Sequence, residues 1–137
     1  MAFDTRFMRE PSAWANECSN RVIGAAIAVH RKLGPGFLEA TYEEALAMEL
    51  EARQIAFARQ HPIVVRYNNV PIAEHRIDLV VEEVLVVELK SVMELNPIFF
   101  AQTRAYLAAA GLDLGLLINF NVRQLREGLH RVVWTIS

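Results

Sequence analysis

Short continuous runs of apolar residues occupy the middle of the chain. Residues 84–87 read Val-Leu-Val-Val, and residues 114–118 read Leu-Gly-Leu-Leu-Ile. Runs this short, rich in β-branched and aliphatic side chains, are typical of strands buried on both faces. We therefore expect strands over residues 84–90 and 114–120. Three weaker apolar runs predict further strands, over residues 63–67, 72–80 and 129–134.

Before these strands, apolar residues recur at the spacing of amphipathic helices. The first helix is predicted to end at Leu33, and either Ser12 or Ser19 can cap its start. It stops because Gly34 can adopt a left-handed cap and Pro35 cannot continue a helix. The apolar side of this helix is formed by Val22, Ile23, Ala26, Ile27, Val29 and His30.

Two more helices complete the predicted elements. One covers residues 38–53, and the other begins with Asn96 as its cap and Pro97 at its first position, and ends at Gly111. The strands over residues 63–90 follow one another without a helix and predict an antiparallel meander. The strand–helix–strand step that follows predicts a parallel crossover. The fold class is therefore α/β, a mixed β-sheet with flanking helices.

Length and composition predict one domain over residues 1–137, with residues 1–11 as a loose N-terminal arm. The net charge of -2 excludes a global basic field, which disfavours a tight, free-standing DNA binder. The lone Cys18 excludes an internal disulfide. No apolar run is long enough for a membrane span, and the N-terminus lacks a signal-peptide pattern, so we expect a cytoplasmic protein that does not enter a membrane.

Three charged residues are set into the two central strands. Glu88 and Lys90 lie two residues apart, so a strand points both to one face. A two-residue turn after the preceding strand would oppose Asp78 to Val87, whereas a three-residue turn or a bulge would oppose Asp78 to Glu88. Residues 82–83 are Glu-Glu and lack the Asn-Gly or Gly-Gly of a tight hairpin, so we expect the longer turn.

The longer turn would bring two carboxylates and a lysine together at one edge of the sheet. Adjacent carboxylates repel each other unless one is protonated or a cation lies between them. Carboxylate oxygens with open coordination positions suit Mg²⁺ or Mn²⁺. The competing interpretation is a buried ion pair with a purely structural role.

An ordered set of motifs gives the chain a specific resemblance. Gly36, Glu39 and Tyr42 form the pattern Gly-x-x-Glu-x-x-Tyr. The supporting motifs are residues 33–36, Asp78, residues 88–90, Ala101-Gln102, Tyr106-Leu107 and residues 115–120. On these residues the chain resembles the PD-(D/E)xK nuclease superfamily and, within it, the GxxExxY proteins, over about residues 22–133. The resemblance implies a restriction-endonuclease-like core of α-β-β-β-α-β order, with an added N-terminal helix and C-terminal strand.

The resemblance also implies roles at a metal site. Asp78 and Glu88 would be ligands of Mg²⁺ or Mn²⁺, with the Leu89 carbonyl as a third oxygen and Glu39 completing the site. Lys90 would orient or deprotonate the attacking water, or stabilise charge on the phosphate. For Glu39 the helix dipole offers a simpler explanation, because it favours a carboxylate in a first turn.

The helix over residues 97–110 carries a second part of the implied site. Gln102 and Tyr106 match a Gln-x-x-x-Tyr pattern, and their spacing puts both on one helix face. Similar proteins often carry a histidine and an acidic residue just before the Ala-Gln pair. Here those positions are Phe99 and Phe100, a departure that favours a module with little or no catalysis.

Taken together, these features predict a metal-dependent nuclease that hydrolyses phosphodiester bonds in DNA or RNA and leaves, by resemblance, a 5′-phosphate and a 3′-hydroxyl. The alternative is a nuclease-like module, weakly active or inactive, that binds nucleic acid or protein. A homodimer or protein partner is attractive, because so small a core offers little surface to grip a duplex.

Two sets of polar residues allow only weaker interpretations. The histidines show no metal-ligand spacing, so we expect surface or capping positions for His30, His61, His75 and His130. Six arginines either gather into a rim that contacts phosphates or are scattered solubilising charge: Arg66, Arg76, Arg104, Arg123, Arg126 and Arg131.

Overall fold

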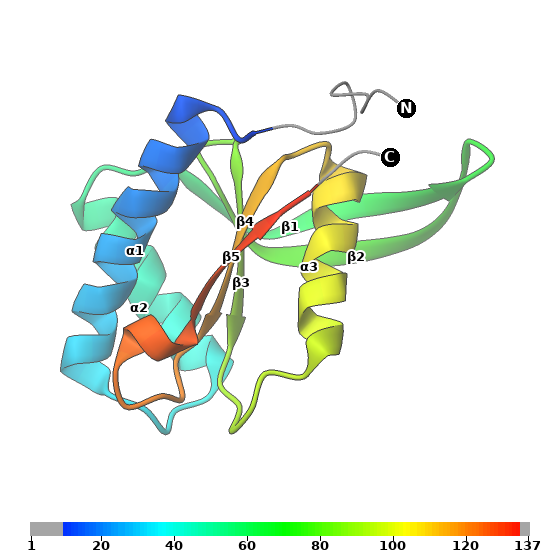
Figure 1. Ribbon diagram of the computed structural model, residues 1–137. Helices are drawn as coiled ribbons and strands as arrows, with labels where there is room; N and C mark the ends of the chain where they lie inside the picture. Colours follow the sequence, from blue (N-terminus) through cyan, green and yellow to red (C-terminus); the bar gives the residue numbers. More distant parts are fainter. Residues whose placement is uncertain (1–9, 135–137) are drawn as a thin grey trace, which may run out of the picture.

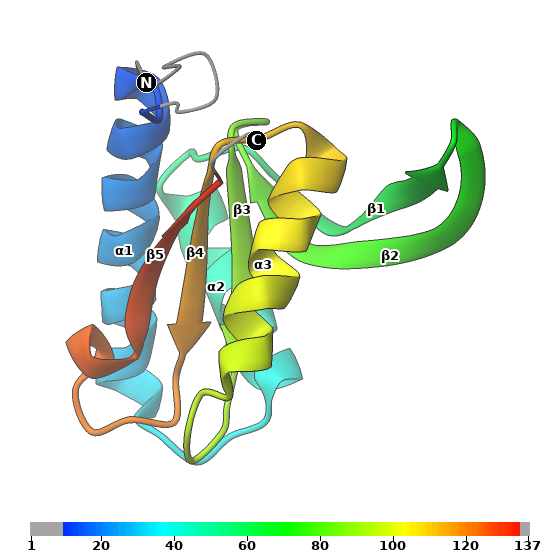
Figure 2. The same cartoon turned by 45° about the vertical axis from the view of Figure 1, so that its right-hand side comes forward.

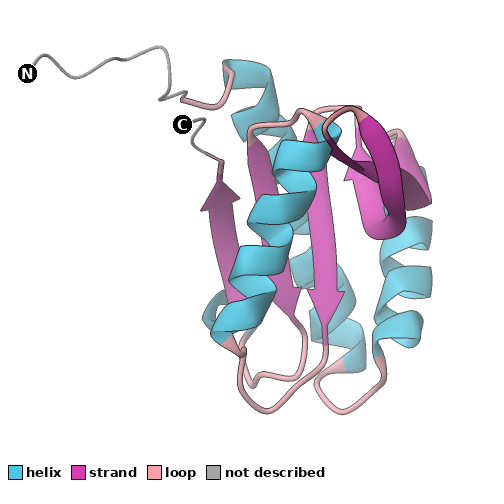
Figure 3. Cartoon of the chain, turned by 90° about the vertical axis from the view of Figure 1, so that its right-hand side faces the viewer, coloured by secondary structure: helices cyan, strands magenta, loops and turns pink. Residues whose placement is uncertain are grey.

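A five-stranded mixed sheet separates two layers of helices, as the computed structural model shows (Figure 1). The structure describes residues 10–134. Helices α1 (Ala13–Leu33) and α2 (Glu39–Ala52) cover one face of the sheet, and α3 (Pro97–Ala110) covers the other (Figure 3). This is the α/β fold that the hydrophobic pattern predicts. Within residues 10–134, no helix is long and apolar enough to cross a membrane.

The strands lie side by side in chain order. They are β1 (Phe57–Tyr67), β2 (Val70–Val81), β3 (Leu85–Lys90), β4 (Leu114–Asn119) and β5 (Leu129–Val133). Only the β3–β4 pair is parallel among the described strands, and it encloses α3 in the sequence, as the predicted crossover requires. A short 3₁₀ helix, η2 (Leu125–Gly128), precedes β5.

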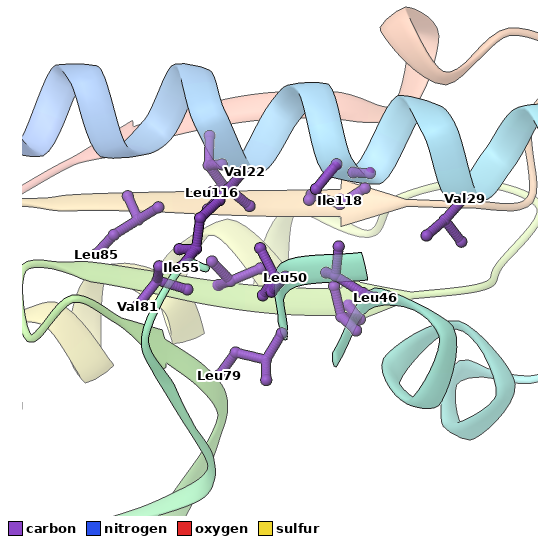
Figure 4. Packing of buried hydrophobic residues seen from close by; sticks show 14 of the residues in the cluster. Val22, Val29, Leu46, Leu50, Ile55, Leu79, Val81, Leu85, Leu116 and Ile118 are labelled. Carbon is purple, nitrogen blue, oxygen red and sulfur yellow. The ribbon is translucent and has the colours of Figure 1, made fainter. Parts of the chain in front are cut away.

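Apolar side chains fill both spaces between the sheet and the helices. On the α1/α2 side, Val22, Leu46 and Leu50 pack against Leu116 and Ile118 of β4 (Figure 4). On the α3 side, a smaller cluster surrounds Leu107 and Leu117. Every residue of β4 is buried, which explains why its sequence is a continuous apolar run rather than an alternation.

Helix α1 begins at the earlier of its two predicted caps. The Ala15 N–H donates to Ser12 Oγ at 3.0 Å, and Gly34 ends the helix with φ 68°. The surface or capping position predicted for His30 is wrong, because this side chain is only 6% exposed. Its place on the apolar side of α1 turns it inward, where its Nε2 lies 2.8 Å from the Val122 carbonyl oxygen.

The hairpin of β1 and β2 is longer than predicted and extends beyond the helix-covered part of the sheet (Figures 1 and 2). The predicted start at residue 63 is wrong, since β1 begins at Phe57. The segment contains Pro62, which an edge strand such as β1 tolerates. Asn68 and Asn69 form the turn between the two strands, with φ 49° and 64°.

Candidate functional site

Strands β2 and β3 separate at the two carboxylates that the sequence singles out. Their backbone pairs are Val81 with Leu85, Val80 with Val86, and Leu79 with Val87. Three residues, 82–84, therefore form the turn, and the same register sets Asp78 opposite Glu88. The prediction of the longer turn is confirmed. Within this turn, Glu82 and Glu83 adopt positive φ of 52° and 59°.

Beyond the last backbone pair, each of the two carboxylates accepts a hydrogen bond from a backbone N–H group of the neighbouring strand. The Asp78 N–H donates to Glu88 Oε1 at 3.1 Å, and the Leu89 N–H donates to Asp78 Oδ2 at 2.8 Å. Each side chain therefore spans from its own strand to the other. These hydrogen bonds fix the orientation of both carboxylates before any ligand binds.

Burial and mutual repulsion keep this pair from ionising normally. Glu88 is 4% exposed, and burial followed by the charge of Asp78 raises its pKa to about 8. Burial also raises the pKa of Asp78, although the Leu89 N–H acts in the opposite direction. Near neutral pH the two carboxyl groups are therefore poised to share a proton or to take up a cation.

Lys90 shares this edge of the sheet without pairing with either carboxylate. Among residues 10–134 it forms no salt bridge with Asp78 or Glu88. Its Nζ lies 4.4 Å from the centroid of the Phe99 ring, in a cation–π contact. The structure therefore shows no close ion pair among these three charges, although the charge of Lys90 partly offsets the rise that burial causes in the pKa of both carboxylates. Phe99, noted in the sequence only as a departure from similar proteins, supports the lysine.

A cavity of about 500 Å³ opens beside these residues, between α2 and the separating strands. Its lining consists of Glu39, Ala40, Glu43, Glu44, Arg59, Gln60, Asp78, Leu89 and Lys90. Glu39 lies in the first turn of α2, and its Oε1 accepts the Ser91 N–H at 3.2 Å. The structure thus brings Glu39 to the same cavity as Asp78, Leu89 and Lys90.

Gln60 is a member of this cavity that the sequence interpretation missed. Its Nε2 donates to Glu43 Oε1 at 2.7 Å and lies 3.5 Å from Asp78 Oδ1. Its φ of 49° marks a distortion of β1 opposite Asp78. No sequence motif predicts the position of Gln60, because residues 57–62 carry no strand-like alternation and residue 62 is proline.

The two predicted residues of α3 have different surroundings. Tyr106 is 9% exposed, and burial followed by the charges of Glu88 and Asp78 raises its pKa. Gln102 is half-buried. Within the described part of the chain, Gln102 makes no hydrogen bond to any other candidate residue. The ring of His75 lies 5.8 Å from that of Tyr106, on the α3 side.

The Gly-x-x-Glu-x-x-Tyr motif shapes the loop that leads into α2. Gly36 has φ 109°, a conformation that side chains disfavour. The fully buried Tyr42 donates its hydroxyl to the Gly34 carbonyl at 2.6 Å and accepts the Phe37 N–H at 3.2 Å. Its ring stacks on Phe120 at 4.5 Å. Tyr42 therefore has a packing role in this loop, and Gly36 supplies its backbone conformation.

We call the point where β2 and β3 separate, at Asp78, Glu88 and Leu89, the strand fork. Its donor atoms suit a hard divalent cation. Asp78 and Glu88 supply two adjacent carboxylates that form no salt bridge among residues 10–134. Asp78 and Leu89 line the cavity, whereas Glu88 is not among its lining residues. Among residues 10–134, no group of three or more His, Cys, Asp or Glu side chains gathers in a geometry that holds a metal. Mg²⁺ often uses only one or two carboxylates and keeps several waters, so the residues present fit this ion.

A comparison with known protein families agrees with this geometry. The family model described as PD-(D/E)XK nuclease superfamily matches residues 16–132. No match was found among curated proteins or among solved structures. The matched segment includes both faces of the sheet and all the residues of the strand fork. This chain therefore belongs to the PD-(D/E)XK nuclease superfamily.

Proposed function

We propose that this protein is a Mg²⁺- or Mn²⁺-dependent nuclease of the GxxExxY type that hydrolyses phosphodiester bonds in DNA or RNA. The observation that carries the proposal is the strand fork. The half-buried Asp78 and the buried Glu88 lie together and are oriented by backbone N–H groups, with no salt bridge to Lys90. If these charged residues served only to stabilise the fold, pairing them or replacing them with apolar residues would give a more stable protein.

Asp78, Glu88 and the Leu89 carbonyl would hold the cation, and Glu39 would complete its surroundings from α2. Held by these residues, a divalent cation would supply a bound water of lowered pKa and positive charge next to the phosphate oxygens. A cation between the two carboxylates would relieve their mutual repulsion, and this relief would contribute to its binding affinity. Cation binding would also displace the proton that Glu88 holds near neutral pH.

Lys90 would act on the phosphate or on the attacking water. Its ammonium is held over Phe99 rather than against a carboxylate, so its positive charge stays available where negative charge develops during phosphodiester cleavage. Tyr106, on α3, would help to position the substrate. Gln102 would contact the substrate from the next turn of α3.

A nuclease-like module with little catalysis is the second candidate. It is favoured by the absence, within the described residues, of a third side chain gathered with Asp78 and Glu88. The cavity is also acidic, with Glu39, Glu43 and Glu44 along α2. Such a module would bind nucleic acid or a protein, as a monomer or a homodimer, without cutting.

A cleavage assay separates the two candidates. Single-stranded and duplex DNA and RNA are incubated with wild type, Lys90→Ala and Lys32→Ala, with Mg²⁺, with Mn²⁺ and with chelator. Lys32 is an exposed residue of α1 outside the candidate cavity and serves as the matched control. The nuclease proposal predicts metal-dependent products from wild type and Lys32→Ala, and a loss of about 100-fold in Lys90→Ala. Equal rates for both variants would contradict the role of Lys90, and no products from any sample would support the binding module.

A further inference from the structure

A second cavity, lined by arginines, lies at the same end of the sheet as the candidate site. Its volume is about 520 Å³. The lining residues are Ile27, His30, Arg31, Gly34, Arg123, Gln124, Leu125 and Arg126. Within residues 10–134, no Asp or Glu lines it, whereas the candidate site is lined by four carboxylates. Three guanidinium groups around one acid-free cavity are typical of a site for a phosphate-bearing ligand.

Separate segments of the chain contribute these arginines, and buried contacts tie the segments together. Arg31 lies in the last turn of α1, and Arg123 and Arg126 lie between β4 and β5. The buried His30 joins the two segments through its contact with the Val122 carbonyl oxygen at 2.8 Å. A Cβ on Gly128 would lie 2.0 Å from the Asn119 carbonyl oxygen, so the backbone after the arginines is packed tightly onto β4. The cavity is therefore built on fixed backbone.

One loop separates the arginine cavity from the candidate site. Gly34 lines the first and Glu39 lines the second, and the Tyr42 hydroxyl holds the loop between them. The ends of β3 and β4 also lie side by side, because the Phe120 N–H donates to the Lys90 carbonyl at 2.9 Å. Figure 1 shows η2, the loop after α1 and the C-terminal ends of both strands at one end of the molecule. A ligand can therefore reach both cavities along this end.

We propose that Arg31, Arg123 and Arg126 bind the phosphodiester backbone of a nucleic acid, on one side of the bond presented to Asp78 and Glu88. The proposal rests on the proposed nuclease function and names the surface that holds the substrate. The chain carries a net charge of -2 and its candidate cavity is acidic, so neither attracts a polyanion. Affinity must come from a local group of cations, and phosphate contacts are the usual source of it.

The test is oligonucleotide binding with divalent cations removed by chelator, so that cleavage plays no part. Fluorescent single-stranded and duplex oligonucleotides are titrated with wild type, with the double variant Arg123→Ala/Arg126→Ala and with Arg104→Ala. Arg104 is an exposed arginine of α3, on the opposite face of the sheet, and controls for the loss of charge alone. All three arginines of the cavity are exposed, and thermal unfolding verifies that the variants fold.

The proposal predicts weaker binding by the double variant and unchanged binding by Arg104→Ala. The slope of log K against log salt should fall by about 0.7 to 0.9 for each phosphate that the variant no longer binds. Arg123→Lys/Arg126→Lys should recover most of that slope, because each lysine retains a charge. Equal affinities and slopes for the double variant and the control would overturn the proposal, as would the absence of oligonucleotide binding by wild type at low salt.

The same samples distinguish this proposal from the nuclease proposal. Metal-dependent cleavage by wild type, together with normal binding by the double variant, would leave the nuclease function standing and remove the arginine cavity from it. Arginine-dependent binding without cleavage under any metal condition would keep the arginine cavity and point to the binding module.

Discussion

The ammonium of Lys90 lies over the ring of Phe99, 4.4 Å from its centroid, although two carboxylates occupy the same edge of the sheet. An aromatic face attracts a cation without neutralising it. The contact therefore holds the lysine in place and leaves its charge for a ligand. Phe99, a position at which this chain differs from similar proteins, therefore serves to hold Lys90.

Replacing Phe99 should affect catalysis through the lysine. Phe99→Leu removes a contact of about 0.5 to 2 kcal/mol, so the cleavage rate should fall by about 2- to 30-fold with little change in KM. Phe99→Tyr, which retains the ring, should recover the rate. Phe100→Leu is the matched control, because Phe100 packs on His130 at 5.2 Å and does not contact Lys90. Equal losses in Phe99→Leu and Phe100→Leu would indicate packing alone.

The metal-free protein should lose stability as the pH rises. The folded state raises the pKa of Glu88 from 4.5 to about 8, so it binds the proton more tightly than the unfolded chain does. The stabilisation is fully present below the unfolded pKa and is lost as the pH passes the folded pKa. Thermal unfolding in chelator should show a midpoint that falls between about pH 5 and pH 9 in wild type and falls less in Glu88→Gln. Parallel curves for the two proteins would show that Glu88 titrates normally.

Two glycine substitutions should change stability in opposite directions. Gly128→Ala puts a Cβ 2.0 Å from the Asn119 carbonyl oxygen and should cost about 3 kcal/mol or more, since backbone must move. Gly24→Ala lies within α1 and meets only the end of the Arg53 side chain at 3.3 Å, so it should stabilise the protein by about 0.5 to 1 kcal/mol. Denaturant unfolding measures both. A neutral Gly128→Ala would mean that η2 does not pack on β4 as described.

The Tyr42 hydroxyl should contribute substantially to the stability of the folded protein. It satisfies the Gly34 carbonyl and the Phe37 N–H, and Tyr42→Phe leaves both without this partner. The expected loss of stability is about 1 to 3 kcal/mol. Tyr67→Phe, at an exposed site in the β1–β2 hairpin, should change stability little. A Tyr42→Phe protein as stable as Tyr67→Phe would show that water replaces the hydroxyl in the loop.

Local patterns were sufficient to predict most of the fold. The buried strands β3 and β4 each contain a short continuous apolar run, and the caps at Asn96 and Gly111 delimit α3 as expected. The start of β1 was missed because edge strands need no apolar alternation and tolerate proline. The burial of His30 was missed because its partner, the Val122 carbonyl, lies far away in the sequence.

The candidate site was predicted in part. The opposition of Asp78 and Glu88 follows from strand period and turn length, both of which are readable in the sequence. The position of Gln60 depends on a local distortion of β1, and the contact of Lys90 with Phe99 depends on how α3 packs across β3. Tertiary packing sets these features, so no spacing rule along the chain predicts them. The arginine cavity is another such feature, because its residues come from two distant segments.

Divalent-cation binding by calorimetry tests the central claim most directly. Mg²⁺ and Mn²⁺ are titrated into wild type, Asp78→Ala, Glu88→Ala and Glu74→Ala, the last removing an exposed carboxylate of the hairpin outside the candidate cavity. We expect one binding event in wild type and in Glu74→Ala, and its loss in both site variants. Binding that persists in Asp78→Ala and Glu88→Ala, or no binding by wild type with or without oligonucleotide, would contradict the assignment of the strand fork as a metal site.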